Sequence, residues 1–429
     1  MRPTTRRAAE VGSVLVRHGL GSLADLFELR VVEPIARERR APVPIGPVRL
    51  RRALEELGTT FIKLGQVLST RPDIVPPDYE VELARLQDGA PTIATADVVT
   101  AIERSLGRPI AALFASFDPV PIAAASIGQV HAATLPDGSE VVVKVRRPGV
   151  VERVRVDLDL LERVARAAAR RSEVARRYDP LGLAREFGAT LLAELDYVRE
   201  GRNAELVATG FAGNARVHVP AVVWDRTCDA VITEERVRGT KVDDVRALDA
   251  LGLDRSAVAR DFADAYLSMV FVHGFFHADP HPGNVFVEPG GRIGFVDFGM
   301  VGSVRPGTAR GLGSILVAVV AADAVGMADG LLRLGIACDD VDRPTLERDL
   351  ARMLLRYSRL PLEDLHLGPL LADVMGVVRE HRLRLPSDLA LLLKTVMMCE
   401  GVAARLDPEF ELVPMLLPYA ARLATGDQS

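Results

Sequence analysis

Apolar residues recur at helical spacing in three stretches of the first half of the chain. Residues 11–40 and 48–70 carry them three and four positions apart, which predicts two helical segments. The connector at 41–47 holds three prolines, and proline removes a backbone hydrogen bond inside a helix, so we expect the two segments to be separate. A third helical stretch is predicted at 181–207, where acidic side chains stand among apolar ones.

Other segments show the pattern of strands. Ser126–Thr134 and Glu140–Arg146 alternate between apolar and polar side chains or are β-branched, and the Pro-Asp-Gly-Ser between them predicts a hairpin turn. Two further strands are predicted at 217–223 and 230–237. The rest of the chain is predicted to be mainly helical, with one short hairpin at 285–295.

Lys144 stands among four valines in the second of these strands. An unpaired ammonium group is costly in a buried strand, so this lysine either reaches solvent from an edge strand or pairs with a carboxylate.

The third helical stretch carries three polar residues on one predicted face. They are Asp196, Glu200 and Asn203, which are spaced four and three positions apart. These side chains form either a solvated face or the partner of the lysine. Glu194, two residues before Asp196, points elsewhere on a regular helix and should have a different partner.

Two polar motifs hold two aspartates and an asparagine at fixed separations. Residues 277–284 read His-Ala-Asp-Pro-His-Pro-Gly-Asn, and residues 297–299 read Asp-Phe-Gly. Asp279 precedes Asn284 by five positions, and Asn284 precedes Asp297 by thirteen. Protein-kinase-like folds use this spacing to place a catalytic aspartate, a metal-binding asparagine and a metal-binding aspartate around nucleotide phosphates. A polar turn followed by a hairpin is the alternative explanation.

With these motifs the chain resembles the ABC1, UbiB or ADCK family (also called AarF) of atypical kinase-like proteins. The resemblance covers nearly all of the chain from about residue 50. The motifs that carry it are, in order, Lys63-Leu64-Gly65-Gln66, the alanine-rich loop within Ala123–His131, Val143-Lys144-Val145, Glu194-Leu195-Asp196, the 277–284 loop and Asp297-Phe298-Gly299.

This resemblance implies an α+β, bilobal protein-kinase-like fold. It has a small β-containing N-lobe, a helical C-lobe and a family-specific N-terminal helical extension. We expect residues 1–108 to form the extension that carries Lys-x-Gly-Gln, residues 109–238 the N-lobe with a helical insertion, and residues 239–429 the C-lobe with the catalytic loop and Asp-Phe-Gly. The implied cofactors are ATP and Mg²⁺.

The resemblance also assigns roles to individual residues. Asp279 is the expected proton acceptor, Lys144 the ligand of the α- and β-phosphates, and Glu200 the partner that holds Lys144. Asn284 and Asp297 are the expected ligands of Mg²⁺. The predicted nucleotide-binding residues are Ala123, Ala124, Ala125, Ser126, Ile127, Gly128, Gln129, Lys144 and Glu234. The predicted regulatory residues are Lys63, Gln66, Glu194 and Asp196, and either of the last two could pair with Lys63.

Departures from ordinary protein kinases shape the expected activity. The alanine-rich loop replaces a glycine-rich one, and Ala278 stands where the usual kinase has an arginine that binds a phosphorylated activation loop. The family's Lys-x-Gly-Gln segment is implied to fold over the place where a protein substrate would lie. We therefore expect ATPase activity or phosphoryl transfer to a small molecule, in support of ubiquinone or other isoprenoid-quinone or lipid metabolism.

Two other functions stay open at this point. One is a non-catalytic, nucleotide-binding pseudokinase scaffold for a biosynthetic complex, although the motif lysine and both motif aspartates are present. The other is a small-molecule kinase of the aminoglycoside or choline type, a class that shares the His-x-Asp loop but lacks Lys-x-Gly-Gln.

Composition narrows the partners. The 429 residues include 53 basic and 58 acidic side chains, a net charge of −5, which gives no case for nucleic-acid binding. Cys228, Cys338 and Cys399 fit no metal or disulfide spacing and favour a reducing compartment. We find no signal peptide and no apolar run long enough to cross a bilayer, so we expect a cytoplasmic location, with peripheral contact to the inner face of the membrane.

Arginine is dense at residues 37–40 and 163–177. These segments form either solvated helix faces, which we favour, or a contact with anionic lipid head groups. The expected partners are ATP or ADP, an isoprenoid lipid or quinone precursor, a membrane surface, and a second copy of the chain in a homodimer.

Overall fold

The structure is a computed structural model that describes the chain in segments. The described residues are 3–21, 46–69, 71, 74–86, 91–171, 179–334, 336, 341–358, 366–381, 383 and 385–425. The helical pattern at 22–40, the first part of the proline connector, and the arginine-rich residues 37–40 and 172–177 lie outside them.

The chain divides into two compact units. The first contains Met1–Arg199 and Val223–Glu235, and the second contains Glu200–Val222 and Arg236–Ser429. The three-part division at residues 108 and 238 stays a prediction.

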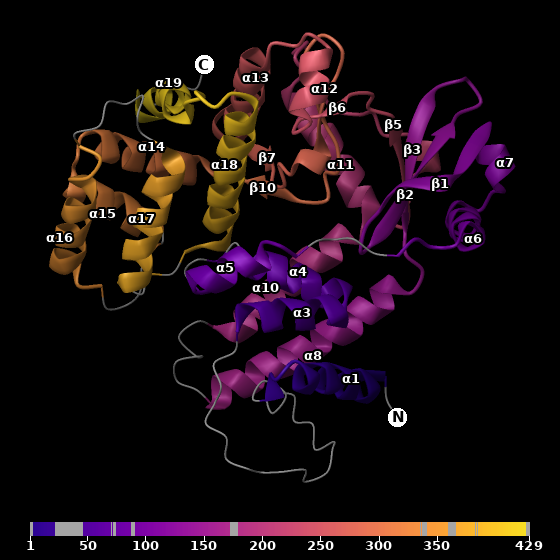
Figure 1. The fold of residues 1–429 in the computed structure, drawn as a ribbon, viewed down its shortest axis with the longest axis horizontal. Helices are drawn as coiled ribbons and strands as arrows, with labels where there is room; N and C mark the ends of the chain where they lie inside the picture. Colours follow the sequence, from indigo (N-terminus) through magenta and orange to yellow (C-terminus); the bar gives the residue numbers. More distant parts are fainter. Residues whose placement is uncertain are drawn as a thin grey trace. The chain divides into compact units, whose positions relative to one another are not determined.

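The helical part of the first unit is built around one long helix, α8. Its described helices are α1 (Pro3–Arg17), α3 (Pro47–Leu57), α4 (Thr59–Leu68), α5 (Pro77–Leu83), α8 (Val150–Arg171) and α10 (Pro180–Glu194). α8 contacts α1, α4 and α10 (Figure 1). Arg7 of α1 donates from Nε to Asp157 of α8 at 2.7 Å, and Asp157 is only 1% exposed. Because this buried charge is paired, it can lie inside the helical layer.

The pattern at 48–70 predicts one helical stretch, and the structure has two helices there. Gly58 separates α3 from α4 with a φ of 90°, a conformation that glycine adopts without the clash of a Cβ. The turn redirects the chain, so α4 contacts both α8 and α10. The single continuous helix was therefore wrong, although both parts are helical.

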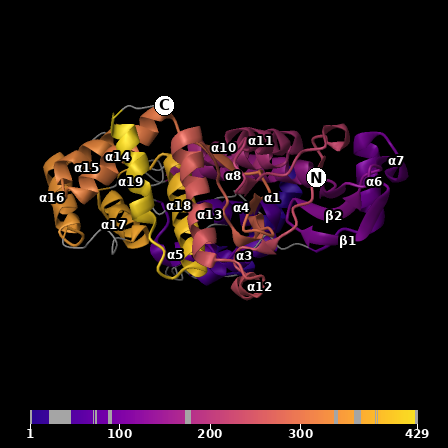
Figure 2. The same cartoon turned by 90° about the horizontal axis from the view of Figure 1, so that it is seen from above.

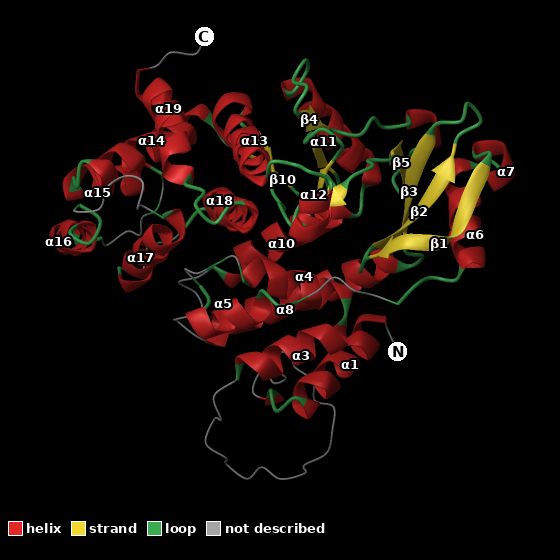
Figure 3. Cartoon of the chain, turned by 45° about the horizontal axis from the view of Figure 1, so that its top comes forward, coloured by secondary structure: helices red, strands yellow, loops and turns green. Residues whose placement is uncertain are grey.

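The first unit also contains a four-stranded antiparallel sheet. Its strands are β1 (Ser116–Ala124), β2 (Gly128–Thr134), β3 (Glu140–Arg146) and β5 (Val231–Glu235), in the order β1-β2-β3-β5. The predicted hairpin turn joins β2 to β3, and Leu135 donates to the Ser139 carbonyl at 2.8 Å. Helix α6 (Thr95–Leu106) contacts β3 and β5, and α7 (Ile110–Leu113) follows it (Figure 3).

The third helical stretch is also two helices rather than one. α10 ends at Glu194 and α11 spans Tyr197–Gly210. Asp196 lies in the break, where its carboxylate accepts from the Val198 amide at 3.1 Å and so caps the start of α11. The prediction that Asp196 shares a helix face with Glu200 is therefore wrong, because a capping side chain lies outside the helix.

Two small sheets organise the loops of the second unit. β4 (Val217–His218), β9 (Ile293–Phe295), β8 (Val285–Val287) and β6 (Thr240–Lys241) form one sheet in that order, and β7 (Phe275–His277) pairs with β10 (Val301–Ser303). The predicted hairpin at 285–295 is present as β8 and β9. The predicted strand at 217–223 is regular only over its first two residues, and Trp224–Arg226 is a 3-10 turn.

Helices make up most of the second unit. Besides most of α11, they include α12 (Val245–Ala250), α13 (Arg255–Ser268), α14 (Pro306–Val320), α15 (Ala324–Arg333), α16 (Arg343–Leu354), α17 (Leu367–Glu380), α18 (Ser387–Leu406) and α19 (Leu412–Thr425). Figure 2 shows α13 alongside α18, and these two helices are in contact. Among the described residues, no helix is both long enough and apolar enough to cross a bilayer.

Candidate functional site

His277 ends β7 and links the backbone at Asp279 to the backbone at Val296, both in the second unit. Its ring is fully buried, Nε2 donates to the Val296 carbonyl at 3.1 Å, and Nδ1 accepts from the Asp279 amide at 3.3 Å. These bonds place the ring proton on Nε2, since Nδ1 acts as the acceptor. The ring also packs edge-on against Phe298, with centroids 5.2 Å apart. His277 therefore orients the backbone on both sides of the site.

Asn284 and Asp279 are hydrogen-bonded to each other. Asn284 Nδ2 donates to Asp279 Oδ2 at 3.0 Å and to the Asp279 carbonyl at 3.2 Å. Asn284 stands just before β8, and its carbonyl accepts at 3.0 Å from the amide of Val296, which stands just after β9. The β8–β9 hairpin therefore brings Asn284 beside the residue that precedes Asp297.

Asp297 has a backbone φ of 63°. This left-handed conformation costs an ordinary residue about 1–2 kcal/mol, and aspartate tolerates it better than most. The carboxylate Oδ1 accepts from the Gly299 amide at 3.3 Å, and Met300 accepts from the Ala278 amide at 3.0 Å. Backbone hydrogen bonds on both sides of Asp297 thus connect the Asp-Phe-Gly turn to residues 277–284, the catalytic-type loop.

α11 supports the same turn through two residues of one face. Asn203 Nδ2 donates to the Phe298 carbonyl at 3.0 Å. A Cβ placed on Gly299 would lie 3.8 Å from Glu200 Oε2, so the Glu200 carboxylate stands beside the turn. Glu200 is only 2% exposed. The second unit therefore gathers Asp279, Asn284, Asp297 and Glu200.

Lys144 lies in an internal strand of the first unit. β3 runs between β2 and β5, with Val130 and Ile232 as the partners of Lys144. The edge-strand explanation of this lysine is therefore wrong. Its Nζ lies 5.2 Å from the centroid of the Tyr197 ring, a cation–π contact with a fully buried tyrosine. Tyr197 opens α11, the helix that carries Glu200 one turn further along.

The alanine-rich loop is the turn between β1 and β2. Ala123 and Ala124 end β1, and the Ala125 amide donates to the Gly128 carbonyl at 2.9 Å. A Cβ on Gly128 would overlap the Tyr197 hydroxyl and lie 2.9 Å from the Val145 carbonyl oxygen. Only glycine fits this position, because the aromatic ring covers it.

Gln129 contributes its backbone, and not its side chain, to the loop surface. The side chain is fully buried, accepts from the Ile93 amide at 2.7 Å and contacts His131 Nε2 at 2.9 Å. His131 Nδ1 in turn donates to the Asp118 carbonyl at 2.8 Å. The predicted contact of Gln129 with nucleotide is thus limited to its main chain.

Lys63 of α4 forms an ion pair with Glu194, the last residue of α10, at 3.2 Å. Both side chains are largely buried, at 14% and 7% exposure. Gln66, one turn further along α4, donates to the Leu86 carbonyl at 3.2 Å. Of the two acids that could pair with Lys63, the structure selects Glu194, and Asp196 caps α11.

Comparisons with known proteins identify the family. Residues 85–330 match the ABC1 atypical kinase-like domain, and residues 350–411 match the UbiB helical domain. The first match alone covers more than half of the chain. The chain belongs to the ABC1/UbiB family.

Related proteins carry the same family names. A protein of Xanthomonas campestris named probable protein kinase UbiB is 35% identical over 98% of this chain and 78% of its own length. An uncharacterized protein of Synechocystis is 38% identical over 87% of this chain, which spans 64% of that relative. Rv3197 of Mycobacterium tuberculosis, solved as a complex with erythromycin, has a TM-score of 0.59 at 26% identity and covers 82% of this chain and 90% of its own. The α+β kinase-like fold is therefore confirmed.

Within this ABC1 fold, Glu234 stands at the end of β5. It pairs with Val142 of β3 and is only 6% exposed. The first unit ends at the next residue, Glu235. Glu234 is thus the penultimate residue before the chain passes into the second unit.

The donor set of the ABC1 site suits a hard cation. Asn284 uses its amide nitrogen for Asp279, which leaves the amide oxygen out of those bonds. An amide oxygen and the Asp297 carboxylate are oxygen ligands of the kind that Mg²⁺ takes alongside phosphate and water. Within the described ranges, no three or more His, Cys, Asp or Glu side chains form a ready-made metal cluster. The residues therefore fit a magnesium ion that needs phosphate to complete its shell.

The UbiB helical domain supports the catalytic-type loop through α18. Thr395 is 1% exposed, and its hydroxyl donates to the Leu391 carbonyl at 2.9 Å and lies 3.3 Å from the Ala278 carbonyl.

Burial raises the pKa of Cys399, one turn along α18, well above its usual range. Burial, with smaller contributions from Cys399 and Asp279, also raises the pKa of Tyr266. Sequence reasoning missed Thr395 and Tyr197, because their roles depend on which element packs beside them.

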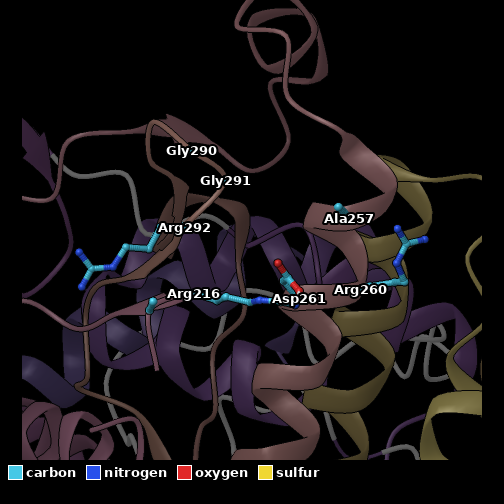
Figure 4. A pocket seen from close by; sticks show the side chains of 8 residues that line it. Arg216, Ala257, Arg260, Asp261, Gly290, Gly291 and Arg292 are labelled. Carbon is cyan, nitrogen blue, oxygen red and sulfur yellow. Dashed lines mark hydrogen bonds and ion pairs between the residues drawn. The ribbon is translucent and has the colours of Figure 1, made fainter. Parts of the chain in front are cut away.

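A separate cavity of about 420 Å³ lies elsewhere in the second unit, next to α13 and the β8–β9 turn. Its lining includes Arg216, Arg260, Asp261 and Arg292. Figure 4 shows Arg216 directed at Asp261, with which it forms an ion pair, while Arg260 and Arg292 turn away from that pair. The lining contains none of the predicted site residues, so we do not assign the kinase-type chemistry to it.

Proposed function

We propose that this ABC1/UbiB protein binds ATP with Mg²⁺ and acts as an ATPase or as a phosphotransferase toward a small molecule. The hydrogen-bonded pair Asn284–Asp279 beside the left-handed Asp297 carries this proposal. Kinase-type phosphoryl transfer needs a carboxylate near the attacking oxygen and oxygen ligands for the metal. When bound, Mg²⁺ would neutralise charge on the phosphate oxygens.

The site residues have separate roles in the proposed phosphoryl transfer. Asp279 accepts the proton of the attacking hydroxyl or water, and Asn284 keeps its carboxylate in place by donating to Oδ2. Asn284 and Asp297 hold the metal through oxygen atoms. Lys144 contacts the α- and β-phosphates, and Glu200 is its acidic partner.

The first unit supplies the remaining contacts in this proposal. The main chain of the alanine-rich loop covers the phosphates, and the main chain near Glu234 meets the adenine. Ala123–Ala125 carry methyl groups in place of glycine hydrogens, which restricts how closely the loop can fold. This restriction, with the Lys63–Glu194 pair, favours a water or small-molecule acceptor over a protein one.

Nucleotide binding is tested by thermal denaturation with and without saturating MgATP. A ligand at 100 times its dissociation constant stabilises the native state by about 2.7 kcal/mol, so the melting temperature should rise by several degrees. Asp297→Asn should fold normally, since asparagine also tolerates a positive φ, and should lose most of that rise. An unchanged melting temperature of the wild type would contradict the proposal.

Catalysis is tested separately by phosphate release. Asp279→Ala should lower the MgATP hydrolysis rate about 100-fold or more, the usual contribution of a positioned base. Equal rates in wild type and variant would instead favour the nucleotide-binding scaffold. Anionic and neutral liposomes, added in parallel, would show whether a membrane surface changes the rate.

We further propose that the acceptor or partner is an isoprenoid lipid or quinone precursor, ubiquinone metabolism being the case that the UbiB name suggests. Support comes from the family and from relatives named UbiB. Under this proposal the protein works in the cytoplasm at the inner face of a membrane, as a monomer or a homodimer. Mass spectrometry of lipid that co-purifies with the wild-type protein tests it. Recovery of no prenylated lipid from membranes that contain it would count against the lipid link.

A further inference from the structure

The tip of the alanine-rich loop is fastened at three consecutive carbonyl groups. Arg147 Nε donates to the Ala125 carbonyl at 2.9 Å, and the Arg147 amide donates to the Ile127 carbonyl at 2.9 Å. Between them, the hydroxyl of Thr59 donates to the Ser126 carbonyl at 3.1 Å. These three hydrogen bonds restrain the backbone at the tip of the loop.

Arg147 joins the loop to a second segment of the same unit. Its Nη2 donates to the Pro91 carbonyl at 2.7 Å, in the segment that leads into α6. Burial lowers the pKa of Arg147 below its usual value, which reflects a guanidinium partly withdrawn from water. The carbonyl groups that surround it compensate for part of that lost hydration.

The Ile127 side chain anchors the loop to the helical part of the unit. It is 7% exposed and belongs to an apolar cluster with Leu191 and Leu195, against which Leu64 and Val67 of α4 also pack. α4 therefore contacts the loop through Thr59 and packs against the same apolar cluster that contains Ile127.

Thr59 and Lys63 share one face of α4. Thr59 is the first residue of this helix and Lys63 is four positions later, so the two side chains lie one turn apart. Thr59 touches the loop, and Lys63 pairs with Glu194 at the end of α10. A shift of α4 that opens the ion pair must therefore also act on the Ser126 carbonyl.

We propose that Thr59 is a positioning residue that couples the alanine-rich loop to the Lys63–Glu194 ion pair, with Arg147 as the fixed support of the loop. The position of α4 then sets how tightly the loop holds the nucleotide. This inference rests on the proposed nucleotide binding for its functional part. Its mechanical part, the restraint of the loop by Thr59, concerns the protein without ligand.

Thr59→Val removes the donor and keeps the shape of the side chain. Thr95→Val is a matched control, because Thr95 is also the first residue of its helix and also donates to a carbonyl, that of Pro119, at 3.1 Å. Hydrogen exchange of residues 123–129 in the ligand-free protein should be about three- to tenfold faster in Thr59→Val and unchanged in Thr95→Val. Melting temperatures of both variants establish that each is folded.

Arg147→Met provides a second measurement on the same loop. Its control is Arg226→Met, since Arg226 also donates from Nε to a carbonyl, that of Leu113, at 2.8 Å. Arg147→Met should also speed exchange in 123–129, and Arg226→Met should not. Equal exchange of the loop in Thr59→Val and Thr95→Val would overturn the proposal.

The functional part is measured by the dissociation constant of MgATP. Thr59→Val should raise this dissociation constant about three- to tenfold. Lys63→Met should change the binding free energy at most half as much in the Thr59→Val background as in the wild type. Additive shifts would overturn the coupling. A wild type that binds no MgATP, with the loop still loosened by Thr59→Val, would refute the proposed function and support the mechanical restraint.

Discussion

At the scale of single residues, the packing of Tyr197 determines which residue fits at position 128. Gly128 is the only glycine of the alanine-rich loop, and the Tyr197 hydroxyl occupies the space that a Cβ would need. The same tyrosine lies 5.2 Å from the Lys144 ammonium. Gly128 and Lys144, sixteen positions apart along the chain, thus both lie next to the Tyr197 side chain.

Gly128→Ala should destabilise the protein by about 1–3 kcal/mol, the usual cost of inserting a methyl group into a packed site. Tyr197→Phe removes the hydroxyl and should reduce that cost, while the clash with the Val145 carbonyl remains. Urea unfolding of the two single variants and the double variant measures the difference. An equal cost in both backgrounds would show that Tyr197 does not crowd this position.

Cys399 gives a prediction for the dependence on pH. Its thiol titrates near 9.0 in an unfolded chain, and burial raises the folded pKa well above that value. Above pH 9 the unfolded state releases this proton and the folded state keeps it, so the unfolding free energy falls as the pH rises. The slope should be up to about 1.4 kcal/mol per pH unit steeper than in Cys399→Ala. Urea unfolding of both proteins from pH 7 to 10.5 measures it, and parallel curves would contradict the assignment.

At the scale of elements, the ends of helices place the site. α10 ends at Glu194, which pairs with Lys63, and Asp196 starts α11 by accepting from the Val198 amide. α11 then carries Glu200 and Asn203 to the Asp-Phe-Gly turn. The break between two helices therefore separates the acid that pairs with Lys63 from the acid that stands beside the Asp-Phe-Gly turn.

Asp196→Ala should lower stability by about 1 kcal/mol, the usual cost of losing an N-cap, and Asp196→Asn by less than half of that. Asp244→Ala is the control, because Asp244 caps α12 by accepting from the Ala247 amide at 3.1 Å. Both alanine variants should lose similar stability in urea. Only Asp196→Ala should weaken MgATP binding, since α12 carries none of the predicted site residues.

At the scale of the whole molecule, the predicted site residues divide between the two compact units. The first unit contains Lys144, Glu234 and the alanine-rich loop, and the second contains Glu200 and the 277–299 segment. The proposed function assigns nucleotide contacts to both sets, so MgATP should affect both units.

Hydrogen exchange with and without MgATP tests this division. Saturating MgATP should slow exchange in residues 123–129 of the first unit and in residues 279–299 of the second. Asp297→Asn should lose the protection in both, because a phosphate that is not neutralised by the metal is held less tightly. Protection confined to one unit would contradict a shared ligand.

The hairpin and the motifs of the site could be predicted from the sequence, because they depend on residues close together in the chain. The hairpin at 285–295 depends on a short turn and on side-chain alternation, and it lies between Asn284 and Asp297. Motif spacing indicated the family, which the comparisons then confirmed over more than half of the chain. The helical patterns were right in type and wrong in continuity, because a single glycine φ at Gly58 and a single cap at Asp196 ended helices that periodicity alone would continue.

The sequence by itself determined which residues could perform phosphoryl-transfer chemistry, since residue type and short-range spacing are local properties. Only the tertiary structure decided that Glu194 rather than Asp196 meets Lys63, that the Gln129 side chain turns inward, and that β3 is an internal strand. It also decided that Thr59 reaches the alanine-rich loop across 67 positions of sequence. Such partners depend on how helices and strands dock, and docking is set by the packing of many side chains together rather than by any one motif.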